Sequence, residues 1–241
     1  MPETQKPKLG FCLLAGALAG FINGFFGAGG GMVLVPLLLW LVRLEDKAAF
    51  SSAVAVILPL CAVSIAVYAV HDSLPLRDAL PYLIGGAAGG VLVPEDPGEG
   101  AASDPRRRDF GGRGAADRML RFLGAILAGL VCGVLSGFGI GGGSLLMVWM
   151  TAVLSMDQKA AQGVNLLYFL PCAACALIFH IKNRQIVWPA VWPAAAAGAV
   201  CAVGGALLAQ QADAETLRKL FGGFLILVGL SEVFLKGLKK K

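Results

Sequence analysis

Residues 27–31 read GAGGG and residues 139–143 read GIGGG, and each glycine run interrupts a long apolar stretch. The two runs lie 112 positions apart, and the same offset relates the sequence around them. Between Leu18 and Ala62, 13 of 45 residues are identical to the residue 112 positions later. Self-similarity at a fixed offset is typical of an internal duplication. We therefore expect two structural repeats, each containing a helix that its glycine run breaks.

The composition predicts a polytopic integral membrane protein. The chain is 57% hydrophobic and 15% charged, and its mean hydropathy is +0.76. A soluble domain carries about 25% charged residues. The net charge of +5 does not indicate nucleic-acid binding, because Lys and Arg in short loops mark the cytoplasmic face of a membrane protein. We expect a multi-pass, all-α protein of the cell membrane, with the lipid bilayer as its surroundings.

Apolar segments of two lengths alternate along the chain. Two short segments, 32–43 and 144–155, each follow a glycine run. Twelve residues of helix reach about 18 Å, too little to cross a hydrocarbon core of about 30 Å. We interpret these two as half-helices that begin inside the membrane. The long segments are expected to be transmembrane helices, and they fall at 9–26, 48–70, 76–93, 119–138, 160–181, 188–209 and 219–236.

The distribution of positive charge favours seven crossings with the N-terminus outside. In that layout 14 Lys and Arg residues are cytoplasmic and 6 are outside, and the positive-inside rule favours such an asymmetry. The alternative, in which both half-helices also cross, gives a best division of 13 to 7 with the Lys-rich tail outside. In the seven-crossing layout the two repeats are inverted relative to each other. Residues 1–93 form the first repeat, 94–118 a polar flexible linker, and 119–241 the second repeat with an extra C-terminal helix and a Lys-rich tail.

The glycine runs are the first candidates for a binding site. Glycine in a helix interior costs about 1 kcal/mol relative to alanine, so each run should unwind its helix. The first amides of the following half-helix then lack partners and, with the helix dipole, favour an anion. Unwound backbone of this kind is where many carriers hold their substrate. Close packing through small residues is the alternative. The candidate glycines are Gly27, Gly29, Gly30, Gly31, Gly139, Gly141, Gly142 and Gly143.

Polar side chains beside the two runs complete the candidate site. Asn23 lies one turn before the first run, Ser144 starts the second half-helix, and Asn165 lies in the long segment after it. The two asparagines could bind a substrate or join helices, and Ser144 could cap its helix or donate to a ligand. Other polar residues in apolar segments are Ser51, Ser52, Ser64, Tyr68, Gln162, His180 and Glu232, of which Tyr68 and His180 occupy equivalent positions in the two copies.

Two stretches of the chain resemble the TauE/SafE sulfite exporter family of membrane transporters. GFINGFFGAGGGMVLVPLLLWL followed by EDKAAFSSAVAV is similar to the start of that family, and GVLSGFGIGGGSLLMVWM followed by MDQKAAQGVNLLYFLP is similar to its second half. The resemblance implies transport of a small sulfur-containing or organic anion, such as sulfite, sulfoacetate or thiosulfate. The first copy departs from the family, since the polar linker replaces its fourth long helix.

The chain shows no sequence sign of an enzyme or of a cofactor. It contains neither the P-loop pattern GxxxxGK[ST] nor the metal motif HExxH. Its six cysteines lie in apolar segments, so we expect no disulfide framework and no metal site. An intramembrane enzyme that uses His180 or the pair Cys172 and Cys175 is one alternative to an anion carrier. A non-transporting scaffold is the other, and the sequence leaves the oligomeric state open.

Overall fold

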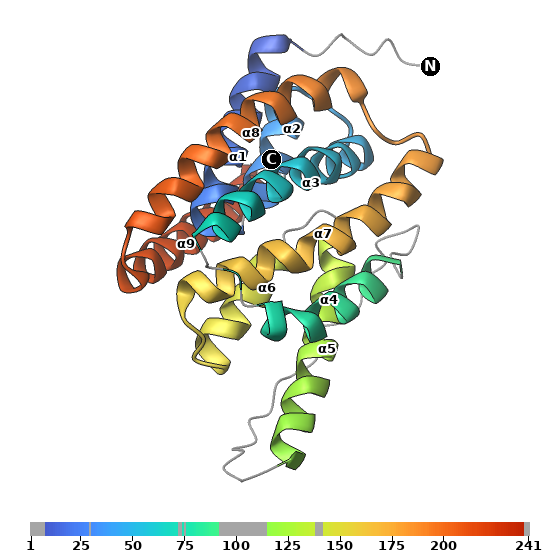
Figure 1. Cartoon of the computed structure of the whole chain (residues 1–241). Helices are drawn as coiled ribbons and strands as arrows, with labels where there is room; N and C mark the ends of the chain where they lie inside the picture. The colour runs from blue at the N-terminus through green and yellow to red at the C-terminus, as the bar shows by residue number, and fades with distance from the viewer. Residues whose placement is uncertain are drawn as a thin grey trace.

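The computed structural model describes residues 8–28, 30–71, 74, 76–91, 115–137 and 142–238, and all regular structure in these ranges is helical (Figure 1). The all-α fold is therefore confirmed. In chain order the helices are α1 (Leu9–Phe26), α2 (Gly30–Trp40), α3 (Asp46–Val70), α4 (Leu76–Val91), α5 (Ala115–Gly137), α6 (Gly142–Val148) with a π-helical turn (Trp149–Val153), α7 (Gln158–Lys182), α8 (Trp188–Gln211) and α9 (Ala214–Leu238).

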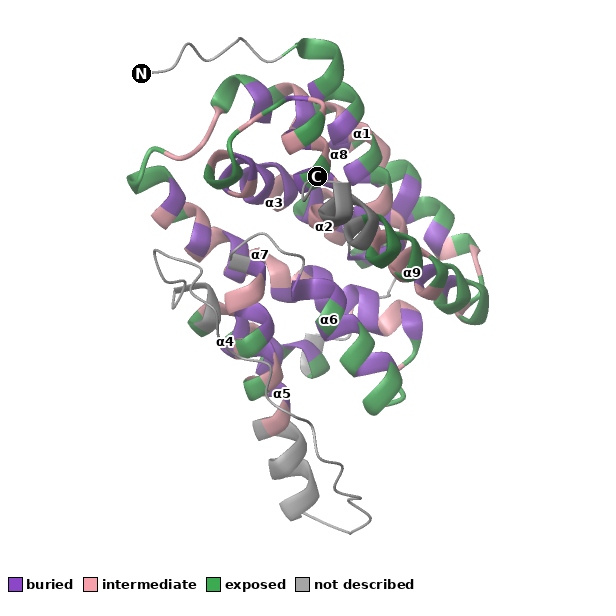
Figure 2. Ribbon diagram, turned by 180° about the vertical axis from the view of Figure 1, so that it is seen from behind, coloured by how far each residue is buried: buried purple, intermediate pink, exposed green. Residues whose placement is uncertain are grey.

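Four of the described helices, α1, α3, α7 and α8, are both long and apolar enough to cross a membrane. Large apolar side chains on the outside of the bundle are exposed, including Val200 at 75% and Ile178 at 70%. Exposed positions continue along α1, α8 and α9 (Figure 2). The exterior is thus apolar, whereas the core holds buried Asn, Gln and Ser side chains. This arrangement is typical of a protein surrounded by lipid rather than by water. The exact set of seven crossings remains a prediction.

Helix boundaries follow the 112-residue offset. Helices α3 and α7 are both 25 residues long, and each residue of α7 lies 112 positions after its counterpart in α3. Helices α2 and α6 begin at Gly30 and Gly142, which are also 112 positions apart. Arg43 and Ser155, again equivalent, have positive φ angles of 59° and 51°, which are uncommon outside glycine. These boundaries support the predicted duplication.

Helices α3 and α7 run antiparallel in the middle of the molecule. Ser51, near the start of α3, lies 3.1 Å from Nδ1 of His180, near the end of α7. At the other end of the pair, Tyr68 donates to Gln162, near the start of α7. Because α3 and α7 are equivalent in sequence, their opposite directions agree with inverted copies.

Helices of the two halves of the chain pack against each other. Helix α8 lies along α1, and α4 lies along α5 and α7. The α1–α8 contact is close because Gly16, Gly20 and Gly24 recur every four residues and so lie on one face of α1. That face lies against the backbone of α8 at Ala194, Gly198 and Ala202.

Some expected boundaries differ from the structure. Helix α5 begins at Ala115, inside the range 94–118 that was expected to be a linker, whereas residues 92–114 lie outside the described part of the chain. The half-helices begin two residues earlier than expected, at Gly30 and Gly142. The terminal amides of a helix have no intrahelical partner in any case, so a glycine costs little in the first turn.

Candidate functional site

The first glycine run breaks the helix as the sequence predicts. Helix α1 ends at Phe26, and Gly27 caps it in the left-handed conformation with φ 62°. Glycine is the residue that adopts this conformation without strain. Helix α2 then begins at Gly30. In the second copy α5 ends at Gly137 and α6 begins at Gly142, while Gly29, Gly139 and Gly141 lie outside the described residues.

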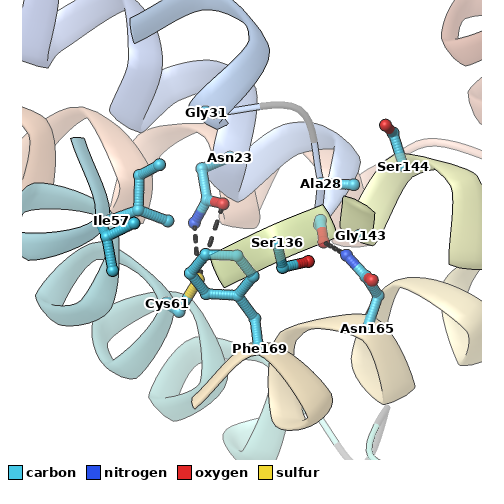
Figure 3. A pocket seen from close by; sticks show the side chains of 13 residues that line it. Asn23, Ala28, Gly31, Ile57, Cys61, Ser136, Gly143, Ser144, Asn165 and Phe169 are labelled. Atoms are coloured by element: carbon cyan, nitrogen blue, oxygen red, sulfur yellow. Dashed lines mark hydrogen bonds between the residues drawn. The ribbon is translucent and has the colours of Figure 1, made fainter. Parts of the chain in front are cut away.

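A pocket lies between the two breaks (Figure 3). Gly27, Gly30 and Gly31 line it from the first break, and Gly143 and Ser144 line it from the start of α6. Asn23 and Asn165 line it as well, so seven of the eleven predicted site residues lie at this pocket. Gly142 does not line it: its Cα faces α5 at Cys132 and Ser136.

The remaining lining residues were not predicted. Two are polar, Cys61 of α3 and Ser136 of α5, and the others are Ala28, Val54, Ile57 and Phe169. Ser136 could have been selected from the sequence, since it lies three residues before the second glycine run, much as Asn23 lies four residues before the first. None of the described lining residues carries a charge.

Asn23 joins α1 to α3 beside the pocket. Its Nδ2 lies 3.6 Å from Sγ of Cys61 and 3.5 Å from Oγ of Ser64. The Cys61 thiol in turn lies 3.7 Å from Oδ1 of Asn23. Both ends of this amide therefore have protein partners, and the side chain is 3% exposed. Asn23 joins helices and also lines the pocket.

Asn165 fixes the first break from α7. Its Nδ2 donates a 2.6 Å hydrogen bond to the carbonyl of Gly27, the residue that ends α1. The carbonyl at a helix end lacks an intrahelical donor, so this bond satisfies it. The Asn165 side chain is 2% exposed, and its hydrogen bond joins the second half of the chain to the first.

Ser144 brings the two half-helices together. Its hydroxyl lies 3.1 Å from Sδ of Met32 in the first turn of α2. Met32 and Ser144 are themselves 112 positions apart in the sequence, so they are equivalent under the offset that relates the two glycine runs. The half-helices thus start next to each other, one from each copy.

The pocket is narrow in this conformation. The centre of a water-sized molecule can occupy about 20 Å³ of it, little more than a single water needs. A larger solute requires the surrounding helices to separate.

The groups considered for an enzyme lie elsewhere. His180 is bonded to Ser51 and lies 3.2 Å from Oε1 of Gln185. Fifteen residues of helix, about 22 Å, separate it from Asn165. The Cys172 thiol donates to the carbonyl of Gly133 over 3.3 Å. Neither residue lines the pocket, and the side chain of Glu232 lies outside the described part of the molecule.

A bundle with an apolar exterior and two half-helices that start at a shared internal pocket has the architecture of a membrane carrier. The chain belongs to the TauE/SafE sulfite exporter family of membrane transporters, whose sequence profile matches residues 1–93 and 101–231.

Curated relatives are similar over part of their length. A probable membrane transporter protein of Xylella fastidiosa (strain 9a5c) is 31% identical over 93 residues, which are 37% of this chain and 36% of that protein. A probable membrane transporter protein of Haemophilus influenzae is 60% identical over 35 residues, 14% of this chain and 13% of the relative. These matches span about a third or less of the relatives' length. No solved structure matches the chain.

Proposed function

We propose that the protein is a secondary carrier or facilitator that moves a small anion across the cell membrane. The substrate class is a sulfur-containing or organic anion, such as sulfite or a sulfonate. The observation that carries this proposal is the pocket that both glycine breaks share, with the starts of α2 and α6 at its wall.

The chemistry of the wall favours an anion. The first amides of α2, at Gly30 and Gly31, lack intrahelical acceptors and lie at the positive end of the helix dipole. Backbone amides of this kind bind oxyanions at helix N-termini. The described lining residues bring no carboxylate that would repel an anion or attract a cation. Low local polarity strengthens the remaining hydrogen bonds.

The antiparallel arrangement of α3 and α7 supports a transport mechanism. In carriers built from inverted repeats, the site lies between the repeats, and rocking of one against the other exposes it to each side in turn. Here Asn23 comes from the first copy, whereas Gly143 and Asn165 come from the second. Separation of the two copies would widen the narrow pocket and admit the substrate.

Uptake by proteoliposomes of the purified protein tests the proposal, with labelled sulfite, sulfate, thiosulfate and sulfonates. The informative variant is Gly30→Ala, whose new methyl would lie 2.9 Å from Cβ and 3.3 Å from Oδ1 of Asn23. We expect it to lower uptake about tenfold or more, because small misplacements of binding groups are costly. Gly204→Ala in α8 is the matched control, since a methyl there meets no atom within 4 Å.

The same assay separates a carrier from a scaffold. The narrowness of the pocket is the observation that favours a scaffold. A folded protein that takes up none of these anions would contradict the proposed carrier and favour the scaffold. If neither Gly30→Ala nor Gly204→Ala changes the rate of uptake, the glycine breaks are not the binding site.

A further inference from the structure

The orientation of the Asn165 amide is fixed by one contact. Its partner at 2.6 Å is the carbonyl oxygen of Gly27, and a carbonyl can only accept a hydrogen bond. The NH₂ group must therefore face Gly27. Oδ1, on the other side of the amide plane, then faces away from that carbonyl.

This Oδ1 atom is a buried acceptor without a protein donor. It receives no hydrogen bond from any residue that the structure describes, and the Asn165 side chain is 2% exposed and lines the pocket. A methyl group built on Gly143 would lie 2.9 Å from Oδ1 and 3.0 Å from Nδ2, so the absence of a side chain at Gly143 leaves room for this amide at the start of α6. Buried polar atoms are nearly always satisfied, and leaving one unpaired is costly.

A second open oxygen lies nearby. Oγ of Ser136 is also buried without a hydrogen bond to the described part of the chain, and it borders the start of α6, where a methyl on Gly142 would lie 2.7 Å away. Ser136, Gly143 and Asn165 surround one side of the pocket (Figure 3). A hydroxyl can both donate and accept, so Ser136 can extend a hydrogen-bond chain from the ligand.

We propose that Asn165 selects anions that carry a hydrogen-bond donor, such as a hydroxyl group, in addition to their negatively charged oxygens. The inference rests on the proposed function: the charged end of the ligand accepts from the amides of α2, and its hydroxyl group donates to Oδ1 of Asn165. An anion without a donor leaves this buried oxygen unpaired. A site built for a hydrogen bond discriminates strongly against an analogue that lacks it.

Two sulfonates of similar size and equal charge test this selectivity. Isethionate ends in a hydroxyl group where propane-1-sulfonate ends in a methyl group. We expect proteoliposomes of the wild-type protein to take up isethionate at least about tenfold faster at low concentration. Asn165→Leu should bring the ratio of the two rates close to one, and Gly143→Ala should lower it, since the new methyl would crowd the Asn165 amide, 2.9 Å from Oδ1 and 3.0 Å from Nδ2.

The matched control is Asn23→Leu. Asn23 lines the same pocket, but both ends of its amide are already bonded to the protein, so this change should lower both rates alike and preserve their ratio. The ratio is measured within each variant, so a partial loss of folded protein does not alter it.

Each outcome decides the inference. Equal uptake of the two sulfonates by the wild-type protein, or a ratio that Asn165→Leu and Gly143→Ala both leave unchanged, would overturn it while leaving anion transport in place. Uptake of sulfite without uptake of isethionate would overturn it too. Uptake of no anion at all would overturn both the inference and the proposed function.

Discussion

Tyr68 of α3 donates a 2.8 Å hydrogen bond to Oε1 of Gln162 in α7. The same hydroxyl lies 3.3 Å from the carbonyl of Gly24, and Nε2 of Gln162 lies 3.4 Å from the carbonyl of Phe25. This network joins α1, α3 and α7 immediately before the first glycine break. It holds the end of α1 in place, and with it the wall of the pocket.

The network should contribute measurably to stability. Tyr68→Phe removes the donor and leaves Oε1 of Gln162 without it, so we expect the free energy of unfolding to fall by about 0.5–1.5 kcal/mol. Thermal unfolding in detergent measures the loss. The double variant with Gln162→Leu should cost less than the sum of the two single changes, because once Gln162 is replaced, Tyr68→Phe no longer leaves Oε1 without its donor. Strict additivity would show that the two side chains do not interact.

The close contact of α1 with α8 makes Gly20 sensitive to substitution. A methyl at this position would overlap the backbone of Gly198, so Gly20→Ala must push the two helices apart. We expect a loss of about 1–3 kcal/mol, as for other overpacked cores. Thermal unfolding monitored by circular dichroism gives the value.

Gly204→Ala serves as the control for this stability series. Its methyl group meets open space, and alanine is the better helix former, so stability should stay the same or rise slightly. Equal losses at positions 20 and 204 would contradict the close packing of α1 on α8.

The predicted orientation can be tested at two exposed arginines. In the seven-crossing layout Arg184, after α7, is cytoplasmic, and Arg218, near the start of α9, is outside. An impermeant maleimide applied to intact cells should therefore label Arg218→Cys and leave Arg184→Cys unlabelled until the membrane is opened. Both variants are made in a protein whose six native cysteines have been replaced, so that the maleimide labels only the introduced cysteine. Labelling of both positions from outside would exclude this layout.

The sequence predicted the helical breaks because their cause is local. Glycine runs weaken a helix wherever they occur, and α1 and α2 are interrupted between Phe26 and Gly30 as expected. The π-helical turn at Trp149–Val153 has no such local signal in this sequence. The spacing of Gly16, Gly20 and Gly24 was available as a packing signal, but the helix that it faces is set by the tertiary fold.

The candidate site was predictable only near the breaks. Asn23 could be selected as a polar residue one turn before the first glycine run, and Asn165 as a polar residue in the long apolar segment that follows the second run. Cys61 lines the pocket because α3 crosses α1 at Asn23, and neither spacing nor composition indicates that crossing. Likewise, the hydrogen bond from Asn165 to Gly27 joins residues 138 positions apart, a distance over which sequence patterns carry no information about contact.

If a small anion binds where α2 and α6 begin, its position can be determined directly in crystals of the protein. Selenite can replace sulfite, and the anomalous scattering of its selenium marks its position in crystals of the protein. We expect a selenium peak in the pocket, with the selenite oxygens within hydrogen-bonding distance of the amides of Gly30 and Gly31. A peak confined to the protein surface, with the pocket closed at saturating selenite, would contradict binding at this site.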